Sequence, residues 1–274
     1  MKRNNRTIKP VKIDRRSYIA YKKLLVKFAK QLNLIIARKL FGELNYLEGK
    51  YSKNPEITRN DNFVLGLFSD IDVQAAALLE EYGPLIVSIL TMMKESDQER
   101  FYQNLSEQTG ISLKNILEKE NIHDSFALKI KQNLNLIKTL SQKQLSRVEN
   151  VVLSNLQAGN FKASELKKSL IEDFEMGERH AKFIARDQSH KMTSNLNQLR
   201  YENLGVTSYI WRTAKDRRVR GDPSGKYPNA KPSHYAREGK TYDFAKPPKG
   251  GNPGEDFNCR CYAEPKLPDE FTNL

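Results

Sequence analysis

The sequence predicts an α+β protein, with a mostly α-helical N-terminal region followed by a small C-terminal α+β domain that contains a short antiparallel sheet. Two observations carry this prediction. Up to Leu204, apolar residues recur mostly at three- to five-residue steps, which is typical of amphipathic helices. From Val206 the chain is rich in β-branched and aromatic residues, glycines and prolines, a composition that favours strands and turns.

We expect three parts: a basic disordered arm over 1–13, a helical region over 14–140 and a C-terminal domain over 141–274. The chain of 274 residues is long enough to bury a core, and 38% of its residues are hydrophobic. No internal repeat divides it further. The first half contains no catalytic constellation, so its function cannot be predicted from its own residues.

The helical patterns cover the first three quarters of the chain. The predicted helices are 14–44, 63–82, 85–105, 113–120, 124–140, 141–159, 164–174 and 177–204. The breaks rest on local signals: Gly83-Pro84, Gly110, a capping Ser141, Gly159 and Gly205. On the last helix Gln188 falls on the apolar stripe of Ala181, Ile184, Met192, Leu196 and Leu199, so we expect its amide to bind the backbone of the sheet that follows.

Three segments predict strands: 206–213, 240–244 and 259–264, with a Gly/Pro-rich loop over 245–254. Alternation places Cys259 and Cys261 on one face of the third strand. Two cysteines one residue apart do not form a disulfide scaffold, so reduced thiols are expected. The longest uncharged apolar run, Tyr82–Met93, is too short to cross a bilayer, which predicts a soluble protein without a membrane partner.

The net charge of +13 favours anionic partners, nucleic acid first. Residues 1–30 contain eleven Lys and Arg residues against one acid, which is typical of arms that bind nucleic acid or an acidic protein. A solvated terminus is the alternative. The candidate DNA-binding residues are Lys2, Arg3, Arg6, Lys9, Lys12, Arg15 and Arg16.

The densest set of distinctive residues lies between Ile184 and Cys261. In order these are Ile184–Gln188, Gly205, Trp211–Thr213, Asp216 with Arg218-Val219-Arg220, Ser233-His234, Gly239-Lys240 and Pro253–Cys261. Over about 140–266 this order resembles the phage head morphogenesis (minor head protein) family named after protein F of phage Mu. One departure is the insertion Gly221–Lys231, which separates Arg220 from His234. The motif residues that the resemblance marks are Arg186, Asp187, Gln188, Trp211, Asp216, Arg218, Arg220, His234, Gly239, Pro253, Gly254, Asn258, Cys259, Arg260 and Cys261.

The resemblance implies a non-enzymatic minor capsid protein of a tailed phage or prophage. Its implied partners are the portal protein and capsid or scaffold proteins, and double-stranded DNA is a further candidate because some relatives bind DNA. The implied location is the host cytoplasm during assembly and then the virion head. No cofactor is implied.

Three interpretations of the C-terminal residues stay open. The favoured one is a structural ion-pair network of Arg218, Arg220, Arg260, His234, Glu255 and Asp256 that fixes the loops of a domain with little core. The second is a zinc site formed by His234, Cys259 and Cys261, with Asp216, Asp222 or Asp243 as the fourth ligand; buried free thiols are favoured over it. The third is a nuclease or toxin-like enzyme with His234, Glu238 and Arg220 as candidate catalytic residues. For the whole chain, a plain DNA-binding protein is the other alternative function.

Overall fold

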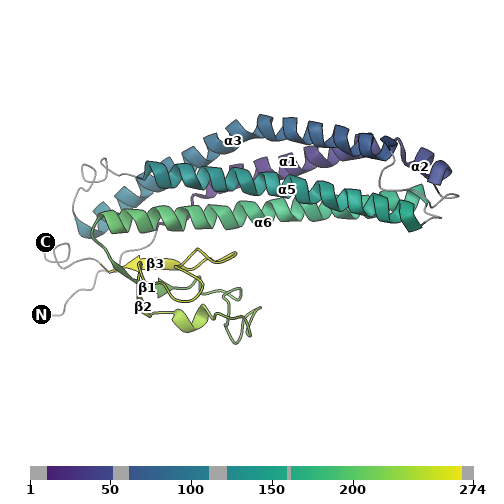
Figure 1. The fold of residues 1–274 in the computed structure, drawn as a ribbon. Coiled ribbons are helices and arrows are strands. Elements are labelled where there is room, and N and C mark those ends of the chain that lie inside the picture. The colour runs from purple at the N-terminus through teal and green to yellow at the C-terminus, as the bar shows by residue number, and fades with distance from the viewer. Residues whose placement is uncertain (1–10, 52–61, 111–121, 159–161, 267–274) are drawn as a thin grey trace, which may run out of the picture. The chain divides into compact units, whose positions relative to one another are not determined.

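The computed structural model describes residues 11–51, 62–110, 122–158 and 162–266 (Figure 1). Long α-helices precede a small antiparallel sheet, which confirms the predicted α+β class. The helices are α1 (Arg15–Leu40), α2 (Leu44–Tyr51), α3 (Asn62–Thr109), α5 (His123–Ala158) and α6 (Ala163–Asn203). The predicted short helix over 113–120 lies outside the described residues.

The chain divides into two compact units. The helical unit comprises Ile19–Ile89 and Ile130–Ala185, and the sheet unit comprises Met1–Tyr18, Leu90–Lys129 and Arg186–Leu274. Helices α1, α3, α5 and α6 therefore each contribute residues to both units. Each unit is described by itself.

Aliphatic and aromatic stripes on α1, α3, α5 and α6 form the core of the helical unit. Phe28 and Tyr82 pack edge to face with ring centroids 5.4 Å apart. The hydroxyl of Tyr21 donates a hydrogen bond of 2.9 Å to Asn133 Oδ1, so this polar pair is satisfied inside the core. Burial at four-residue steps explains why these segments are helical.

Three predicted helix breaks are wrong. Helix α3 continues through Pro84, α5 continues through Ser141, and α6 continues through Gly177. In each case the stripe of buried residues runs on across the local signal; Tyr82, Ile86 and Leu90, for example, are buried on both sides of Pro84. Gly177 has a packing role, because a Cβ there would come within 2.8 Å of Gln144 Oε1.

Because α3 is continuous, its length must be compared again with the thickness of a bilayer. The segment Asn62–Gln108 is long and apolar enough to cross a membrane by length and composition alone, a test that core helices of soluble proteins also pass. The prediction considered the uncharged run Tyr82–Met93, which Glu80, Glu81 and Lys94 bound, whereas helix α3 continues past these charges on both sides.

The sheet consists of β1 (Ser208–Arg212), β2 (Thr241–Asp243) and β3 (Tyr262–Pro265) in the order β2-β1-β3, all antiparallel. Tyr209 pairs with Tyr242, and Trp211 pairs with Ala263. The first two strands lie within their predicted segments. The third begins later than predicted, so that Cys259 and Cys261 precede the strand rather than belong to it.

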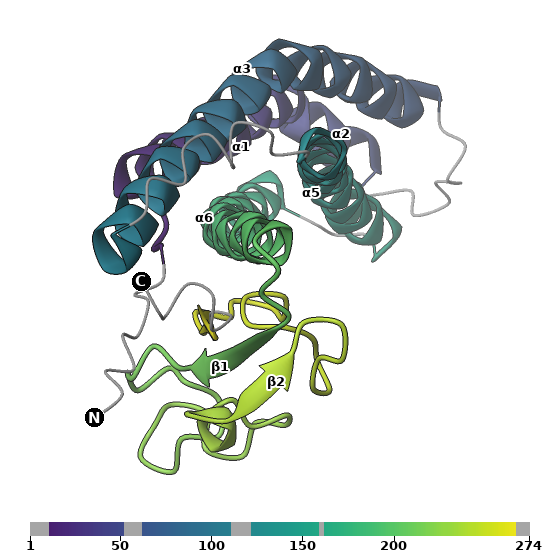
Figure 2. The same cartoon turned by 90° about the vertical axis from the view of Figure 1, so that its left-hand side faces the viewer.

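One face of the sheet packs under the C-terminal part of α6 (Figure 2). Phe101 of α3, Tyr201 of α6, and Tyr209 and Trp211 of β1 belong to a single buried cluster that also contains both cysteines. Gly205 has a φ of 75° and ends α6 as predicted, with Val206 N–H donating to the Tyr201 carbonyl over 2.9 Å. The chain thus turns directly from the helix into the strand that carries the core.

Candidate functional site

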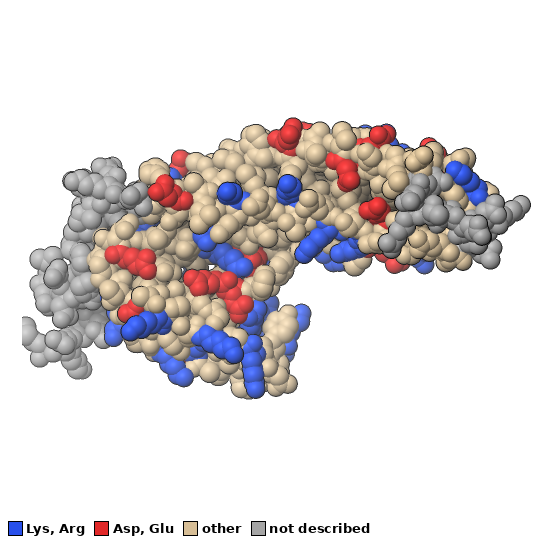
Figure 3. All heavy atoms as spheres, viewed as in Figure 1, with Lys and Arg blue, Asp and Glu red and all other residues tan. Residues whose placement is uncertain are grey.

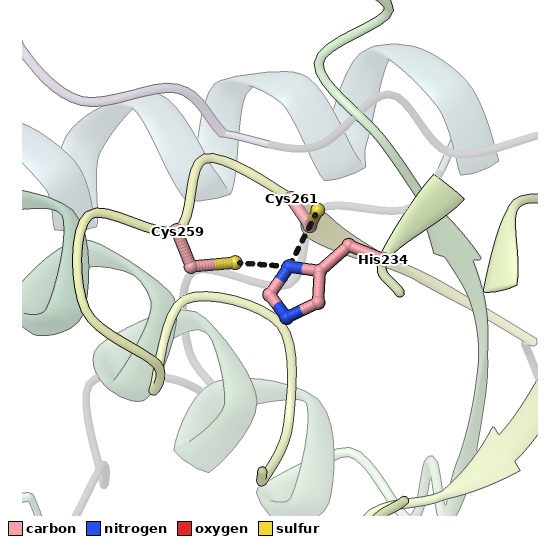
Figure 4. A group of neighbouring side chains, drawn as sticks. All are labelled: His234, Cys259 and Cys261. Atoms are coloured by element: carbon pink, nitrogen blue, oxygen red, sulfur yellow. Dashed lines mark hydrogen bonds between the residues drawn. The ribbon is translucent and has the colours of Figure 1, made fainter. Parts of the chain in front are cut away.

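The site centres on three buried side chains from two loops. His234 precedes the short 3-10 helix η1 (Tyr235–Arg237) in the connection between β1 and β2, and the cysteines lie just before β3. The Nδ1 atom of His234 is 3.5 Å from Cys259 Sγ and 3.7 Å from Cys261 Sγ. Figure 4 shows both sulfurs directed at this one nitrogen. The three residues are 2%, 5% and 6% exposed, respectively.

The other ring nitrogen of His234 faces a carboxylate. Nε2 is 3.4 Å from Asp256 Oδ2, without the alignment of a hydrogen bond. Asp256 is in turn ion-paired with Arg220, whose guanidinium also donates 2.8 Å to the Phe257 carbonyl. Arg220, Asp256 and His234 therefore form a continuous chain of charged and polar contacts.

The insertion Gly221–Lys231 does not separate Arg220 from His234. The carbonyl of Arg220 accepts hydrogen bonds from the N–H groups of His234 and Tyr235, both of 3.0 Å. Gly221 N–H donates to the Tyr227 carbonyl at 2.9 Å, so the inserted residues close on themselves as a loop. The two motif residues are therefore in contact although residues 221–233 lie between them in the sequence.

The two thiols differ electrostatically. The contact with Cys261, followed by that with His234, lowers the pKa of Cys259 well below its usual value. The pKa of Cys261 is raised, first by the neighbouring Cys259 sulfur and then by burial. The N–H of Gly254 also donates to Cys259 Sγ at 3.4 Å, which favours the thiolate at that position.

A second charged cluster adjoins the cysteines. The guanidinium of Arg260 pairs with both carboxylate oxygens of Asp216, which also accepts Arg218 N–H at 2.9 Å. Hydrogen bonds from Arg260 are the largest cause that lowers the pKa of Asp216 well below its usual range. The predicted network thus consists of two groups, one around Asp256 and one around Asp216. Glu255 joins neither by a hydrogen bond, since it accepts Asn252 N–H at 2.7 Å.

The Ile184–Gln188 motif braces the cysteine loop from α6. Asp187, which is 3% exposed in its side chain, accepts Asn258 N–H at 2.5 Å, and Arg186 Nε donates to Asn258 Oδ1 at 2.7 Å. The prediction for Gln188 is wrong: its amide bonds Asp187 Oδ2 at 3.0 Å and does not bind the sheet backbone. The residue on the inner face is Asp187, one position earlier on the helix.

The remaining motif residues secure β1. Trp211 is buried, its ring edge-to-face with His234 at a centroid distance of 5.3 Å. The backbone N–H of Gly239 donates to the Trp211 carbonyl at 2.9 Å. Glu238 accepts both the N–H and the hydroxyl of Thr213, at 2.6 and 2.7 Å, so it is held against β1 rather than paired with His234.

The candidate fourth metal ligands are engaged elsewhere. Asp216 binds the two arginines described above, Asp222 accepts Ser224 N–H at 3.0 Å, and Asp243 accepts Ala245 N–H at 2.7 Å. Among the described residues the group that could hold a metal ion is His234, Cys259 and Cys261, whose ligand atoms all lie within 4.8 Å of one another. Of the candidate DNA-binding residues, Lys12, Arg15 and Arg16 are described and the others lie outside the described residues.

Sequence reasoning missed two residues that complete the site. Asn252 is buried; it accepts the Tyr209 hydroxyl at 2.8 Å and donates to the Phe244 carbonyl at 3.2 Å. Arg237 is also buried and places its guanidinium 4.8 Å from the centroid of Trp211. Their positions depend on how the loops on either side of β2 fold back onto the sheet, and no local sequence pattern predicts this.

Comparison with known proteins locates the same region. Residues 146–264 match the family described as Phage Mu protein F like protein. A Haemophilus influenzae protein described as uncharacterized is 28% identical over 284 residues, an alignment that covers 96% of this chain and 56% of that protein. The chain therefore spans little more than half the length of this relative. No solved structure matches it.

Proposed function

We propose, from the match of residues 146–264 with the family described as Phage Mu protein F like protein, that the protein is a minor head protein that acts in head morphogenesis of a tailed phage or prophage. Its partners are then the portal protein and capsid or scaffold proteins. It associates with them in the host cytoplasm during assembly and remains in the virion head. The observation that carries the proposal is the family match over the segment in which the motif residues occur in order.

The placement of the motif residues supports a docking module. His234, Cys259, Cys261 and Trp211 are buried, and Arg220 and Asp256 bind each other across loops. These side chains fix the shape of the sheet unit. A nuclease mechanism needs a histidine within reach of a substrate, whereas the His234 side chain is 3% exposed. We therefore propose that this unit performs no chemistry.

The surface of the sheet unit indicates what it contacts. Between residues 206 and 266 nine exposed side chains are cationic, and the exposed acid is Glu255. Lys and Arg side chains gather over the loops around the sheet, on the face drawn in Figure 3. The nine are Lys215, Arg217, Arg218, Lys226, Lys231, Lys240, Lys246, Lys249 and Lys266. A field of one sign on a rigid scaffold favours an acidic partner surface.

The test is co-expression of the full chain with the portal protein of the same phage, followed by affinity purification of the portal. We expect the chain to co-purify, and the triple variant Lys226→Glu, Lys231→Glu, Lys249→Glu to be depleted at least tenfold. The matched control, Lys23→Glu, Lys27→Glu, Lys30→Glu, changes the charge equally on exposed residues of α1 and is expected to bind as the wild type. Absence of the wild-type chain from the purified portal would contradict the proposal.

DNA is the second candidate partner, favoured by the same exposed cations. If the chain binds duplex DNA, affinity falls steeply with salt, with a slope of about 0.9 per phosphate neutralised. Deletion of residues 1–10, which leaves the loop lysines in place, should lower that slope. Portal binding that survives while DNA binding is lost would separate the two functions.

A further inference from the structure

We propose that His234, Cys259 and Cys261 bind one Zn²⁺ ion, with solvent in the fourth position, and that this ion fastens the β1–β2 connection to the start of β3. The proposal is independent of the function in the phage head. It concerns a site for which the three ligand atoms are already gathered: His234 Nδ1, Cys259 Sγ and Cys261 Sγ lie within 4.8 Å of one another.

The two sulfur-to-nitrogen distances fit tetrahedral zinc. With Zn–S bonds of about 2.3 Å and Zn–N bonds of about 2.05 Å, a tetrahedral angle separates sulfur from nitrogen by about 3.6 Å. The two sulfurs of the structure lie 3.5 and 3.7 Å from Nδ1. Little side-chain movement is therefore needed to admit the ion.

Hydrogen bonding alone accounts poorly for this convergence. A neutral imidazole has one acceptor nitrogen with a single lone pair in the ring plane. Here two sulfurs are directed at that one nitrogen (Figure 4). A cation at their common centre binds one lone pair from the nitrogen and one from each sulfur at the same time. A single proton shared among these three atoms cannot bind all of them.

The surroundings match those of a metal-binding histidine. Histidines that ligate metals commonly direct their other nitrogen toward a carboxylate, which sets the ring orientation. Nε2 of His234 faces Asp256 at 3.4 Å, and Asp256 is itself held by Arg220. The Gly254 N–H, 3.4 Å from Cys259 Sγ, supplies a hydrogen bond to a ligand sulfur.

Charge balance also favours a buried ion at this site. Zinc binds cysteine as the thiolate, so two thiolates and a neutral imidazole give a zinc site with no net charge. Such a site can be buried at low cost in this cluster, where the three ligand residues are at most 6% exposed.

The first experiment uses the full wild-type chain, purified under reducing conditions and without chelator. Elemental analysis is expected to find about one Zn²⁺ per chain, and exchange with Co²⁺ should give the charge-transfer and ligand-field absorption of a tetrahedral thiolate site. Because this measurement needs no variant, it does not depend on any variant folding. A wild-type chain that binds neither Zn²⁺ nor Co²⁺ overturns the proposal, as does a mass lower by two hydrogens, which marks a disulfide.

The second experiment assigns the ligands. Cys261→Ser and His234→Gln should each lose the Co²⁺ charge-transfer band or shift it, and bind zinc at least tenfold more weakly. The control is His180→Gln on α6, outside the cluster, which should bind zinc as the wild type does. A chelator should lower the Tm of the wild type and leave that of Cys261→Ser unchanged. Zinc binding that is equal in all variants, or lost in the control as well, overturns the assignment.

Discussion

Gly254→Ala tests the contact between the cysteine loop and α6. Gly254 has a φ of 92°, a region that residues with a Cβ rarely adopt. A Cβ at this position would also overlap the Oγ and Cβ atoms of Ser194 on α6. Alanine therefore introduces both backbone strain and a steric clash between the loop and the helix.

The magnitude follows from these two terms. An unfavourable φ costs about 1 to 3 kcal/mol, and an extra methyl group in a packed contact costs about 1 to 3 kcal/mol. We expect Gly254→Ala to lower the free energy of unfolding by about 2 to 6 kcal/mol, a large part of the 5 to 15 kcal/mol that is typical of domains.

The assay is urea unfolding followed by the fluorescence of Trp211. This is the only tryptophan of the chain and lies buried in the sheet unit, so its signal reports on the unit that the substitution disturbs. Gly205→Ala is the matched control. Gly205 also has a positive φ, but nothing lies within 4 Å of its added Cβ, so it measures the backbone cost alone, about 1 to 2 kcal/mol.

Ser194→Gly separates the two terms. In the Gly254→Ala background it removes the overlapping atoms and should restore about 1 to 3 kcal/mol, after correction for the helix propensity of glycine. A Gly254→Ala protein as stable as the wild type would refute the reasoning. So would a double variant with no recovery, because the steric term would then be absent.

Three further predictions follow from individual contacts. Phe101→Ala should destabilise the sheet unit by about 3 to 5 kcal/mol, since Phe101 is buried against Tyr201 and the Arg200 guanidinium; exposed Leu128→Ala should change it by less than about 0.5 kcal/mol in the same urea titration. Tyr21→Phe removes the 2.9 Å bond to Asn133 and should cost about 1 kcal/mol by urea unfolding monitored by far-ultraviolet circular dichroism; an unchanged midpoint would show that the bond contributes nothing. Arg260 holds the pKa of Asp216 below its unfolded value of about 3.9, so the stabilisation is complete above that pH and is lost as the pH falls toward the folded pKa. The stability difference between wild type and Asp216→Asn should therefore be constant near neutral pH and shrink below about pH 4; a difference that grows in acid would contradict this sign.

The periodicity of apolar residues in the first part of the chain and the composition of the last part predicted the class of each region, because both reflect burial over many residues. The strand segments were located by their β-branched and aromatic residues, and Gly205 was identified as the end of α6. Single-residue signals were less reliable inside helices. Pro84, Ser141 and Gly177 each favour a break locally, but the buried stripes on either side outweigh them.

The site could be predicted only as a set of residues. The candidate ligands His234, Cys259 and Cys261 followed from residue type, yet their convergence depends on how the loop after β1 returns to β3. Several arginines were candidate ion-pair partners of Asp256, and the sequence could not show which of them binds it. For Gln188 the error was one position on a helix, because Asp187 carries the inward-facing polar group.

The inserted loop between Arg220 and His234 is a suitable place for a label. The residues that flank it, Arg220 and His234, are joined by a backbone hydrogen bond, and Asn229 within it is exposed. Exposed loop tips tolerate added sequence far better than buried segments. A fluorophore placed at Asn229, between Lys226 and Lys231 of the proposed docking surface, would therefore report whether that surface becomes covered in an assembling particle, while the interior that the two motif residues help to build stays intact.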